Sequence, residues 1–286
     1  MRYNNFFFRF FLAVSLSSLF LFLTSCSEEP TPGPISPTVK VSPQSTMGKV
    51  RPLLRKSDDA VATHRSLAKG LYTDDQLIAM INQQPALSTG ALKTILVSES
   101  PLSENVLLAV LNRSSKMATG DLKAVFLAST PLPAVVEEAI QHTNLMSSGD
   151  LQAVLEAQAG FGGHFLGTTV SKWMTKKEGG QIWHGGHKIK FPAGALPQDS
   201  KAAIEISSSN YVQVEFLPDG WFNKEVTVTI SYKNVDLSGV DEKSLTLAWY
   251  DETTGEWIDV GGSVDIKKKW ITANVWHFTQ YTISTK

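Results

Sequence analysis

Two closely spaced histidines, His184 and His187, form the first candidate site, for a metal ion. The two residues between them are glycines, which favour a hairpin turn, and residues three apart on a strand point to opposite faces of a sheet. No cysteine or carboxylate stands directly beside them to complete a set of metal ligands. We therefore expect two surface histidines in a turn and no metal site.

Three carboxylates, Asp251, Glu252 and Glu256, form a second candidate site, for calcium. Their spacing differs from that of an EF-hand loop, and the threonines and glycine between them are typical of a solvated hairpin tip. The chain also lacks the G-x-S-x-G, H-E-x-x-H and P-loop motifs. We expect no cofactor, no catalytic residues and no enzymatic activity.

All seven tryptophans lie within residues 173–276. Trp249 shares one face of a predicted strand with two leucines, so we expect it in the core. Trp221, Trp257 and Trp270 lie near predicted turns and are the better candidates for exposure, as a surface that stacks on sugar rings. Core packing remains the alternative for most of these rings.

The N-terminus has the three zones of an export signal. Arg2 and Arg9 are positive, and an apolar run of 14 residues follows from Phe10 to Leu23. This run is shorter than the roughly 20 residues that span a bilayer as a helix, and its length is typical of a signal peptide. Cys26 is the only cysteine, so the chain can form no internal disulfide.

The segment Leu23-Thr24-Ser25-Cys26 resembles the lipobox of bacterial lipoproteins. The resemblance implies that residues 1–25 are a cleaved signal peptide and that Cys26 carries the lipid that ties the mature chain to a membrane. Ser27, where inner-membrane lipoproteins have Asp, is similar to the outer-membrane sorting pattern. We expect a lipid-anchored protein of the cell envelope, at the outer membrane or cell surface.

Residues 26–70 are rich in proline and serine and predict a flexible tether. The prolines of residues 29–37 exclude a helix or a central strand there, although a short helix is possible between Met47 and Gly70. The formal net charge of −1 gives no electrostatic attraction to nucleic acid, and we expect none as a partner.

Residues 71–160 contain three copies of one pattern. Three triplets recur at spacings of 30 and 29 residues: Thr89-Gly90-Ala91, Thr119-Gly120-Asp121 and Ser148-Gly149-Asp150. Each copy predicts two short helices. In the first copy, Thr73 and Gln76 form a capping box at the start of the leading helix. In every copy, the opening residue of the triplet (Thr89, Thr119 or Ser148) is expected to cap the second helix. One such hairpin cannot bury its apolar face alone, so we predict a stacked α-helical array.

Residues 165–286 alternate between apolar and polar side chains, as in 212–216, 226–232 and 245–249, with turn residues between. About eight short strands of this kind favour an antiparallel β-sandwich. The predicted fold class is therefore α+β and multidomain: α-helical hairpin repeats followed by an antiparallel β-sandwich.

Several motifs of this last segment resemble those of ZU5 domains. They are the glycines at 179–180, the IKFPAGAL segment at 189–196, the FLPDG segment at 216–220, Trp257, and the ending His277-Phe278-Thr279-Gln280-Tyr281. Ala193 stands where the family usually has Pro, and Thr279 where it usually has Ser. The resemblance implies a ZU5-like interaction domain rather than a catalytic one.

In some ZU5 relatives the H-F-S triplet is a site of self-cleavage. By this resemblance the Thr279 hydroxyl would attack the carbonyl of Phe278 with His277 as base. Cutting here would release only residues 279–286, so we favour a packed strand end.

These patterns indicate a non-enzymatic lipoprotein that acts as a protein-interaction or scaffolding module in the bacterial cell envelope. Its expected partners are the membrane, through the N-terminal lipid, and either a protein or a polysaccharide. A carbohydrate-binding surface lipoprotein and a self-cleaving ZU5 module stay open as alternatives.

Overall fold

Six α-helices are followed by nine β-strands in the described part of the chain. The computed structural model describes residues 49–56, 70–83, 87–113 and 117–286. Cys26, the signal peptide and most of the tether lie outside these residues, so the predictions made on them stay predictions. The predicted order, helices and then antiparallel β structure, is confirmed.

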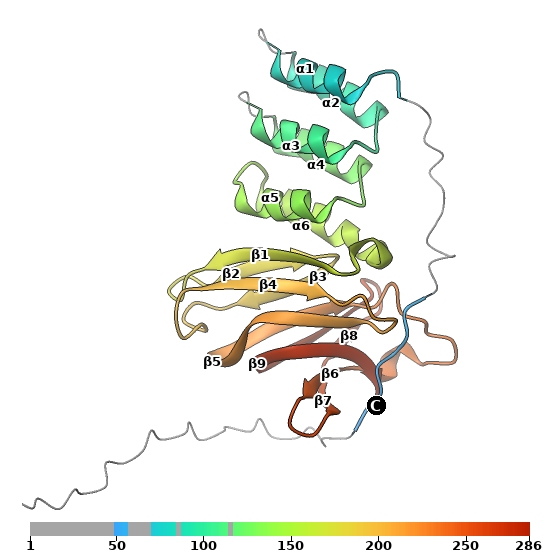
Figure 1. Ribbon diagram of the computed structural model, residues 1–286, viewed down its shortest axis with the longest axis vertical. Coiled ribbons are helices and arrows are strands. Elements are labelled where there is room, and N and C mark those ends of the chain that lie inside the picture. The colour runs from blue at the N-terminus through green and yellow to red at the C-terminus, as the bar shows by residue number, and fades with distance from the viewer. Residues whose placement is uncertain (1–48, 57–69, 84–86, 114–116) are drawn as a thin grey trace, which may run out of the picture. The chain divides into compact units, whose positions relative to one another are not determined.

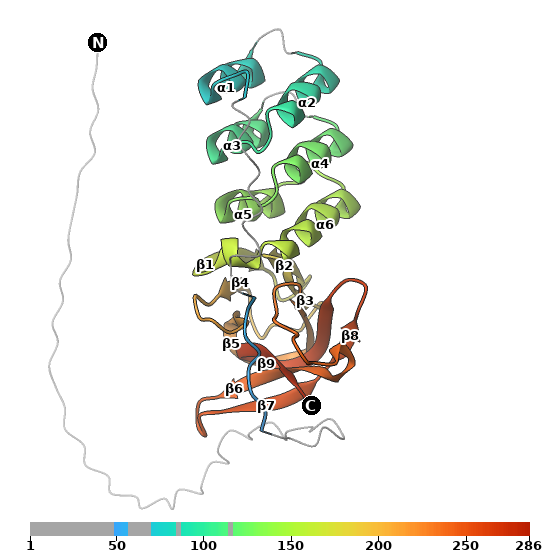
Figure 2. The ribbon, with the colours of Figure 1, turned by 90° about the vertical axis from the view of Figure 1, so that its right-hand side faces the viewer.

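Each copy of the repeat forms one helical hairpin. The helices are α1 (Asp74–Asn82), α2 (Thr89–Ser98), α3 (Glu104–Asn112), α4 (Thr119–Ala128), α5 (Ala134–His142) and α6 (Ser148–Ala157). The three hairpins stack in chain order (Figure 1), with the odd-numbered helices in one row and the even-numbered helices in another (Figure 2). Two short 3-10 helices, at Gln158–Gly160 and Gly162–Phe165, lead into the sheet.

The helix caps agree only partly with the predictions. The capping box is confirmed, since the Gln76 N–H donates to Thr73 Oγ1 at 3.3 Å and the Thr73 N–H donates to Gln76 Oε1 at 2.9 Å. The predicted caps of the second helices are wrong by one residue, because those residues already have helical conformation. Ser88 and Ser147 cap α2 and α6, and Ala118 precedes α4 without a side-chain cap.

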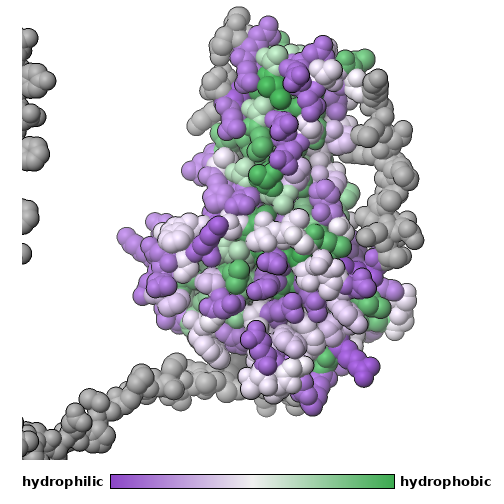
Figure 3. Space-filling model, viewed as in Figure 1, coloured by the Kyte–Doolittle hydropathy of each residue, from purple (hydrophilic) through white to green (hydrophobic). Residues whose placement is uncertain are grey.

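Ion pairs and apolar contacts join neighbouring copies. Two ion pairs link them: Lys93–Asp121 at 3.5 Å and Lys123–Asp150 at 3.2 Å. The first copy has Ala91 in place of the aspartate and the third has Gln152 in place of the lysine, so this series of pairs stops at both ends of the array. Such exposed pairs contribute about 0–1 kcal/mol each, and the buried apolar side chains supply most of the stability. Figure 3 shows further hydrophobic residues at the array's surface among hydrophilic ones.

The β domain is one antiparallel sheet of nine strands. They are β1 (Thr168–Met174), β2 (Gly180–His184), β3 (His187–Phe191), β4 (Ser200–Ile206), β5 (Gln213–Ser231), β6 (Leu245–Asp251), β7 (Glu256–Gly261), β8 (Ser263–Asp265) and β9 (Trp270–Thr285). The hydrogen-bonded order is β1-β4-β5-β9-β6-β7. The β2–β3 hairpin joins β5, and β8 pairs with β9. The strands share one hydrophobic core, to which Val170, Ile189, Ile204, Phe216, Leu247 and Ile271 belong.

Two long strands replace pairs of predicted short ones. The predicted strands 212–216 and 226–232 both fall largely within β5. Two further segments that alternate in the sequence, 271–276 and 281–283, likewise both lie within β9. The register of β5 against β9 shifts between Glu215 and Gly220 and again between Trp221 and Val226. These irregularities interrupt the alternation of apolar and polar residues, which is why the sequence indicates two strands. Pairing with β9 resumes after each irregularity, so β5 continues as one strand without a turn.

Residues 49–56 form an extended strap along the β domain, drawn in blue in Figure 1. The Leu53 N–H donates to the Ile283 carbonyl at 2.9 Å, and the Arg55 N–H donates to the Asn210 carbonyl at 2.8 Å. This part of the predicted tether is therefore bound to the domain, in extended rather than helical conformation.

Candidate functional site

An open groove of about 360 Å³ lies where β5, β6 and β9 meet. Aromatic rings and carboxylates line it. Its main side chains are Trp221 of β5, Trp249 and Tyr250 of β6, His277 of β9, and the carboxylates of Asp219 and Glu252. We call it the aromatic groove.

The irregular stretch of β5 explains why Trp221 is exposed. Gly220 has a φ of +103°, a conformation that favours glycine, and the register shift follows directly after Trp221. The next residue, Phe222, turns inward, with its ring centroid 4.6 Å from that of Phe278. Because neighbouring residues point to opposite faces, the Trp221 side chain points outward and is 60% exposed.

His277 connects the two indole rings of the groove. Its ring centroid lies 4.9 Å from that of Trp221 and 4.6 Å from that of Trp249. Partial burial lowers the pKa of His277, and a hydrogen bond with the backbone of Phe278 raises it by less. The net pKa lies below the ordinary value, so the ring is neutral at pH 7. The Tyr281 hydroxyl donates to the His277 carbonyl at 2.7 Å, which holds this part of β9 in place.

The three residues of the predicted self-cleavage site also line the aromatic groove. His277, Phe278 and Thr279 continue β9, and His277 and Phe278 are in register with Trp221 and Gly220 of β5. The Thr279 hydroxyl donates to the Tyr250 carbonyl at 3.3 Å, while His277 packs against tryptophan rings. Self-cleavage stays a prediction.

The tryptophan predictions have mixed outcomes. Exposure is confirmed for Trp221, whereas Trp257 is half-buried, with its ring centroid 5.2 Å from that of Tyr250. Exposure is wrong for Trp270, which is only 8% exposed and packs against Trp183 within the hydrophobic core of the helical array. A predicted turn near Trp270 could not reveal that helices from an earlier part of the chain cover it.

Two other tryptophans lie partly at the surface. Trp249, predicted in the core, packs against the core but is only half-buried, and it also lines the aromatic groove. Trp173 of β1 is 61% exposed, and no local pattern singled it out.

The prediction that His184 and His187 lie at the surface is wrong, since both are buried at the two ends of the β2–β3 turn. His187 Nδ1 accepts the Ser231 N–H at 3.2 Å. Burial, followed by repulsion from Arg55 of the strap and from His184, lowers the pKa of His187 to about 3. Within the described residues, no group of three or more His, Cys, Asp or Glu side chains is placed to hold a metal ion.

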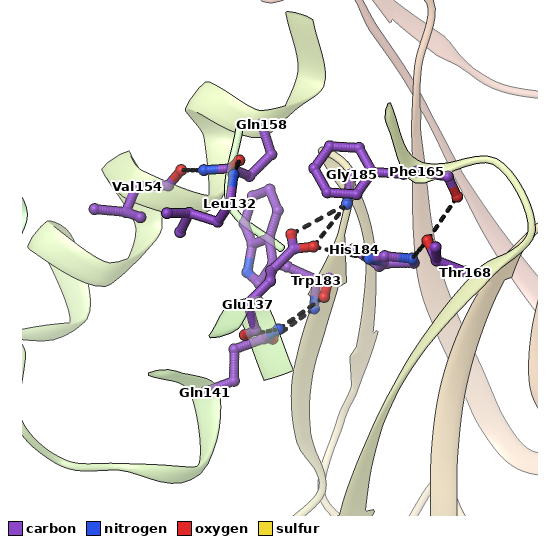
Figure 4. A network of polar contacts seen from close by, with 10 residues as sticks. All are labelled: Leu132, Glu137, Gln141, Val154, Gln158, Phe165, Thr168, Trp183, His184 and Gly185. Atoms are coloured by element: carbon purple, nitrogen blue, oxygen red, sulfur yellow. Dashed lines mark hydrogen bonds and ion pairs between the residues drawn. The ribbon is translucent and has the colours of Figure 1, made fainter. Parts of the chain in front are cut away.

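His184 belongs to a buried polar network that joins helix α5 to the sheet (Figure 4). Its Nδ1 lies 2.8 Å from Glu137 Oε2, and the Gly185 N–H donates to Glu137 Oε1 at 3.1 Å. On the other side of the ring, Nε2 lies 2.8 Å from Thr168 Oγ1, which donates its proton to the Phe165 carbonyl at 2.6 Å. The Thr168 hydroxyl must therefore accept a hydrogen bond from the N–H of His184 Nε2.

Glu137 and His184 share one further proton between them. Burial raises the pKa of Glu137, while its hydrogen bonds and charge interaction with His184 and its bond from Gly185 oppose that rise. The pair is either carboxylate with imidazolium or carboxylic acid with imidazole, and both forms carry no net charge. Both side chains are 0% exposed. Because an unpaired charge is costly to bury, this interface accommodates the two groups only as a pair without net charge.

Gln141, one turn along α5, makes a second link to the sheet. Its amide donates to the Trp183 carbonyl at 2.8 Å and accepts the Trp183 N–H at 2.7 Å. The first two copies have Leu77 and Leu107 at the position of Glu137, and these are buried against neighbouring copies. Polar residues at buried positions of the third copy are thus a sequence signal that the stacking partner changes there.

The order Thr168, His184 and Glu137 is similar to a nucleophile, base and acid arrangement. A substrate would have to reach the hydroxyl, but His184 and Glu137 are fully buried between α5 and β2, and the Thr168 proton is already donated to Phe165. The network therefore serves to hold the array against the β domain.

Comparisons with known proteins do not place the chain in a family. No protein-family model matches the chain, and no curated protein matches it. None of the described helices is both long and hydrophobic enough to cross a bilayer.

Proposed function

We propose that this chain is a bacterial lipoprotein, anchored through Cys26, that acts as a non-enzymatic protein-interaction or scaffolding module of the cell envelope, with a ZU5-like β-sandwich as its binding domain. The observation that carries the proposal is the aromatic groove, in which an exposed Trp221 stands beside Trp249 and Tyr250. Tryptophan and tyrosine are enriched among residues that dominate binding energy at protein interfaces. The buried junction would let the array and the β domain act as one body.

Removing the lipidation site tests the anchor. We expect Cys26→Ala to leave the signal peptide uncut and to abolish lipid attachment, because the thiol is the acylated group. Measurement of the mature mass and of globomycin sensitivity in a bacterial host checks this, with Ser27→Ala as a control that keeps the thiol. Unchanged processing and unchanged membrane partition of Cys26→Ala would contradict the proposal.

The groove is tested by two matched tryptophan variants. We expect Trp221→Ala to weaken partner binding by about 2 kcal/mol or more, since truncating a central aromatic residue has this effect at interfaces. Trp173→Ala removes an equally exposed ring outside the groove and should leave binding unchanged. Cross-linking in the envelope, with quantitative mass spectrometry of the captured protein, provides the measurement. Equal capture by both variants would argue against the groove.

The two alternatives have distinct outcomes. Aromatic rings beside carboxylates also suit a sugar, so retention on a polysaccharide column that Trp221→Ala abolishes would favour carbohydrate binding. Loss of residues 279–286 from the intact mass, prevented by Thr279→Ala, would favour self-cleavage.

A further inference from the structure

We propose that the aromatic groove binds the guanidinium group of an arginine side chain on the partner protein, an inference that rests on the proposed function. Three properties of the groove point to this ligand: the arrangement of its rings, the sign of its charge, and its size.

The rings offer flat surfaces to a flat cation. Trp221 is 60% exposed, and Trp249 forms the neighbouring wall, with the His277 ring packed against both indoles. A guanidinium group stacks on indole more readily than an ammonium group does, because it is planar and weakly hydrated. The neutral state of His277 at pH 7 adds no repulsion to an incoming cation.

The charges of the groove are all negative. Asp219, Asp251 and Glu252 line it, and no lysine or arginine is among its lining residues. Thr253 and Thr254 hold the Asp251 carboxylate through hydrogen bonds of 2.9 and 3.0 Å. Asp219 and Glu252 make no side-chain hydrogen bond or ion pair with any described residue, so their oxygens can accept the several N–H donors of a guanidinium.

The negative charges of the groove affect the pKa of a neighbouring glutamate. Glu215 lies earlier on β5, and its pKa is raised by burial first and then by the charges of Glu205, Asp219 and Glu252. A bound cation would relieve the repulsion among these carboxylates. The groove therefore complements a positive group electrostatically and not only by shape.

The size of the groove favours one side chain over a long polymer. Its volume of about 360 Å³ lies at the lower end of the roughly 300–1,000 Å³ of ligand pockets. One arginine side chain can occupy such a space while the rest of the partner contacts the surrounding surface.

The test compares two peptides on the full-length chain: acetyl-Gly-Arg-Gly-amide and the same peptide with citrulline, which has nearly the same shape but no charge. Binding is followed by nuclear magnetic resonance of the peptide. We expect the arginine peptide to bind at least about tenfold more tightly, with an affinity that falls as salt rises. This comparison needs no variant and does not depend on how a substitution affects folding.

Charge variants then locate the site. Asp219→Asn with Glu252→Gln should weaken arginine binding by roughly tenfold, because charge-assisted hydrogen bonds are lost. The control Glu178→Gln with Glu225→Gln removes two exposed charges outside the groove and should have no effect. Trp221→Ala should weaken binding, and Trp173→Ala should not.

Equal binding of the two peptides, or arginine binding that the groove variants do not change, would overturn the inference. Binding of a neutral oligosaccharide instead of the arginine peptide, lost in Trp221→Ala, would also overturn it. If partner capture depends on Trp221 but the arginine peptide does not bind, the proposed function stands and the arginine inference fails. If the arginine peptide binds but no partner protein is captured, the proposed function fails and the arginine site stands.

Discussion

We expect Glu137→Ala to lower the free energy of unfolding by about 3–5 kcal/mol, because it removes one partner of a fully buried, hydrogen-bonded pair. The substitution leaves His184 Nδ1 without its hydrogen-bond partner and the Gly185 N–H without its acceptor. It also opens a cavity between α5 and β2, where a side chain was fully buried.

Urea unfolding with two probes measures this effect. Far-ultraviolet circular dichroism follows the six helices, and tryptophan fluorescence follows the β domain, since all seven tryptophans lie within residues 173–276. Both transitions should move together, because Glu137 joins the two parts. Glu104→Ala is the matched control: this exposed glutamate in the first turn of α3 should contribute about 0.3–1 kcal/mol. A loss for Glu137→Ala as small as that of the control would contradict a structural role of the junction.

Acid conditions weaken the fold through His187, by about 1.4 kcal/mol for each pH unit between its two pKa values. In the folded chain its pKa is about 3, whereas an unfolded chain has the ordinary value of 6.5. The unfolded state therefore binds the proton first as the pH falls. The stability that the neutral His187 contributes is complete above pH 6.5 and is lost progressively toward pH 3.

His187→Asn isolates this contribution from the other titrating groups. Asparagine offers an oxygen near the place of Nδ1, which can still accept the Ser231 N–H, but it does not titrate. The variant should be less stable at pH 7 because it fills less space. Its stability should nevertheless fall less steeply between pH 6 and pH 4, by about 1.4 kcal/mol per unit. Urea midpoints across this range provide the comparison, and parallel curves for the two proteins would show that His187 does not titrate as described.

Local patterns were sufficient for the helical array. The spacing of the triplets and the capping box at Thr73 predicted helical hairpins, because caps and helical hydrogen bonds involve residues at most four apart. The same reasoning placed the caps of the second helices one residue late, since Ser88 and Thr89 are both chemically able to cap.

Strand boundaries were harder to predict than strand type. Alternation correctly indicated antiparallel β structure, but it was interrupted near Trp221, where β5 is irregular and β9 still supplies the pairing. Continuity of β5 therefore depends on hydrogen bonds to a strand much later in the chain, which a local pattern does not contain.

Burial and the composition of the groove depended on such distant contacts throughout. A glycine turn at 185–186 and a turn near Trp270 are visible in the sequence. Helix α5 nevertheless packs against that glycine turn, and Trp270 belongs to the hydrophobic core of the helical array. Trp221 was recognisable as an exposed ring, whereas Trp249 and His277 joined it only through the pairing of β5 and β6 with β9. Periodicity tells which side chains share a face of one element. The packing of elements far apart in the chain decides whether that face meets water, a core or a ligand.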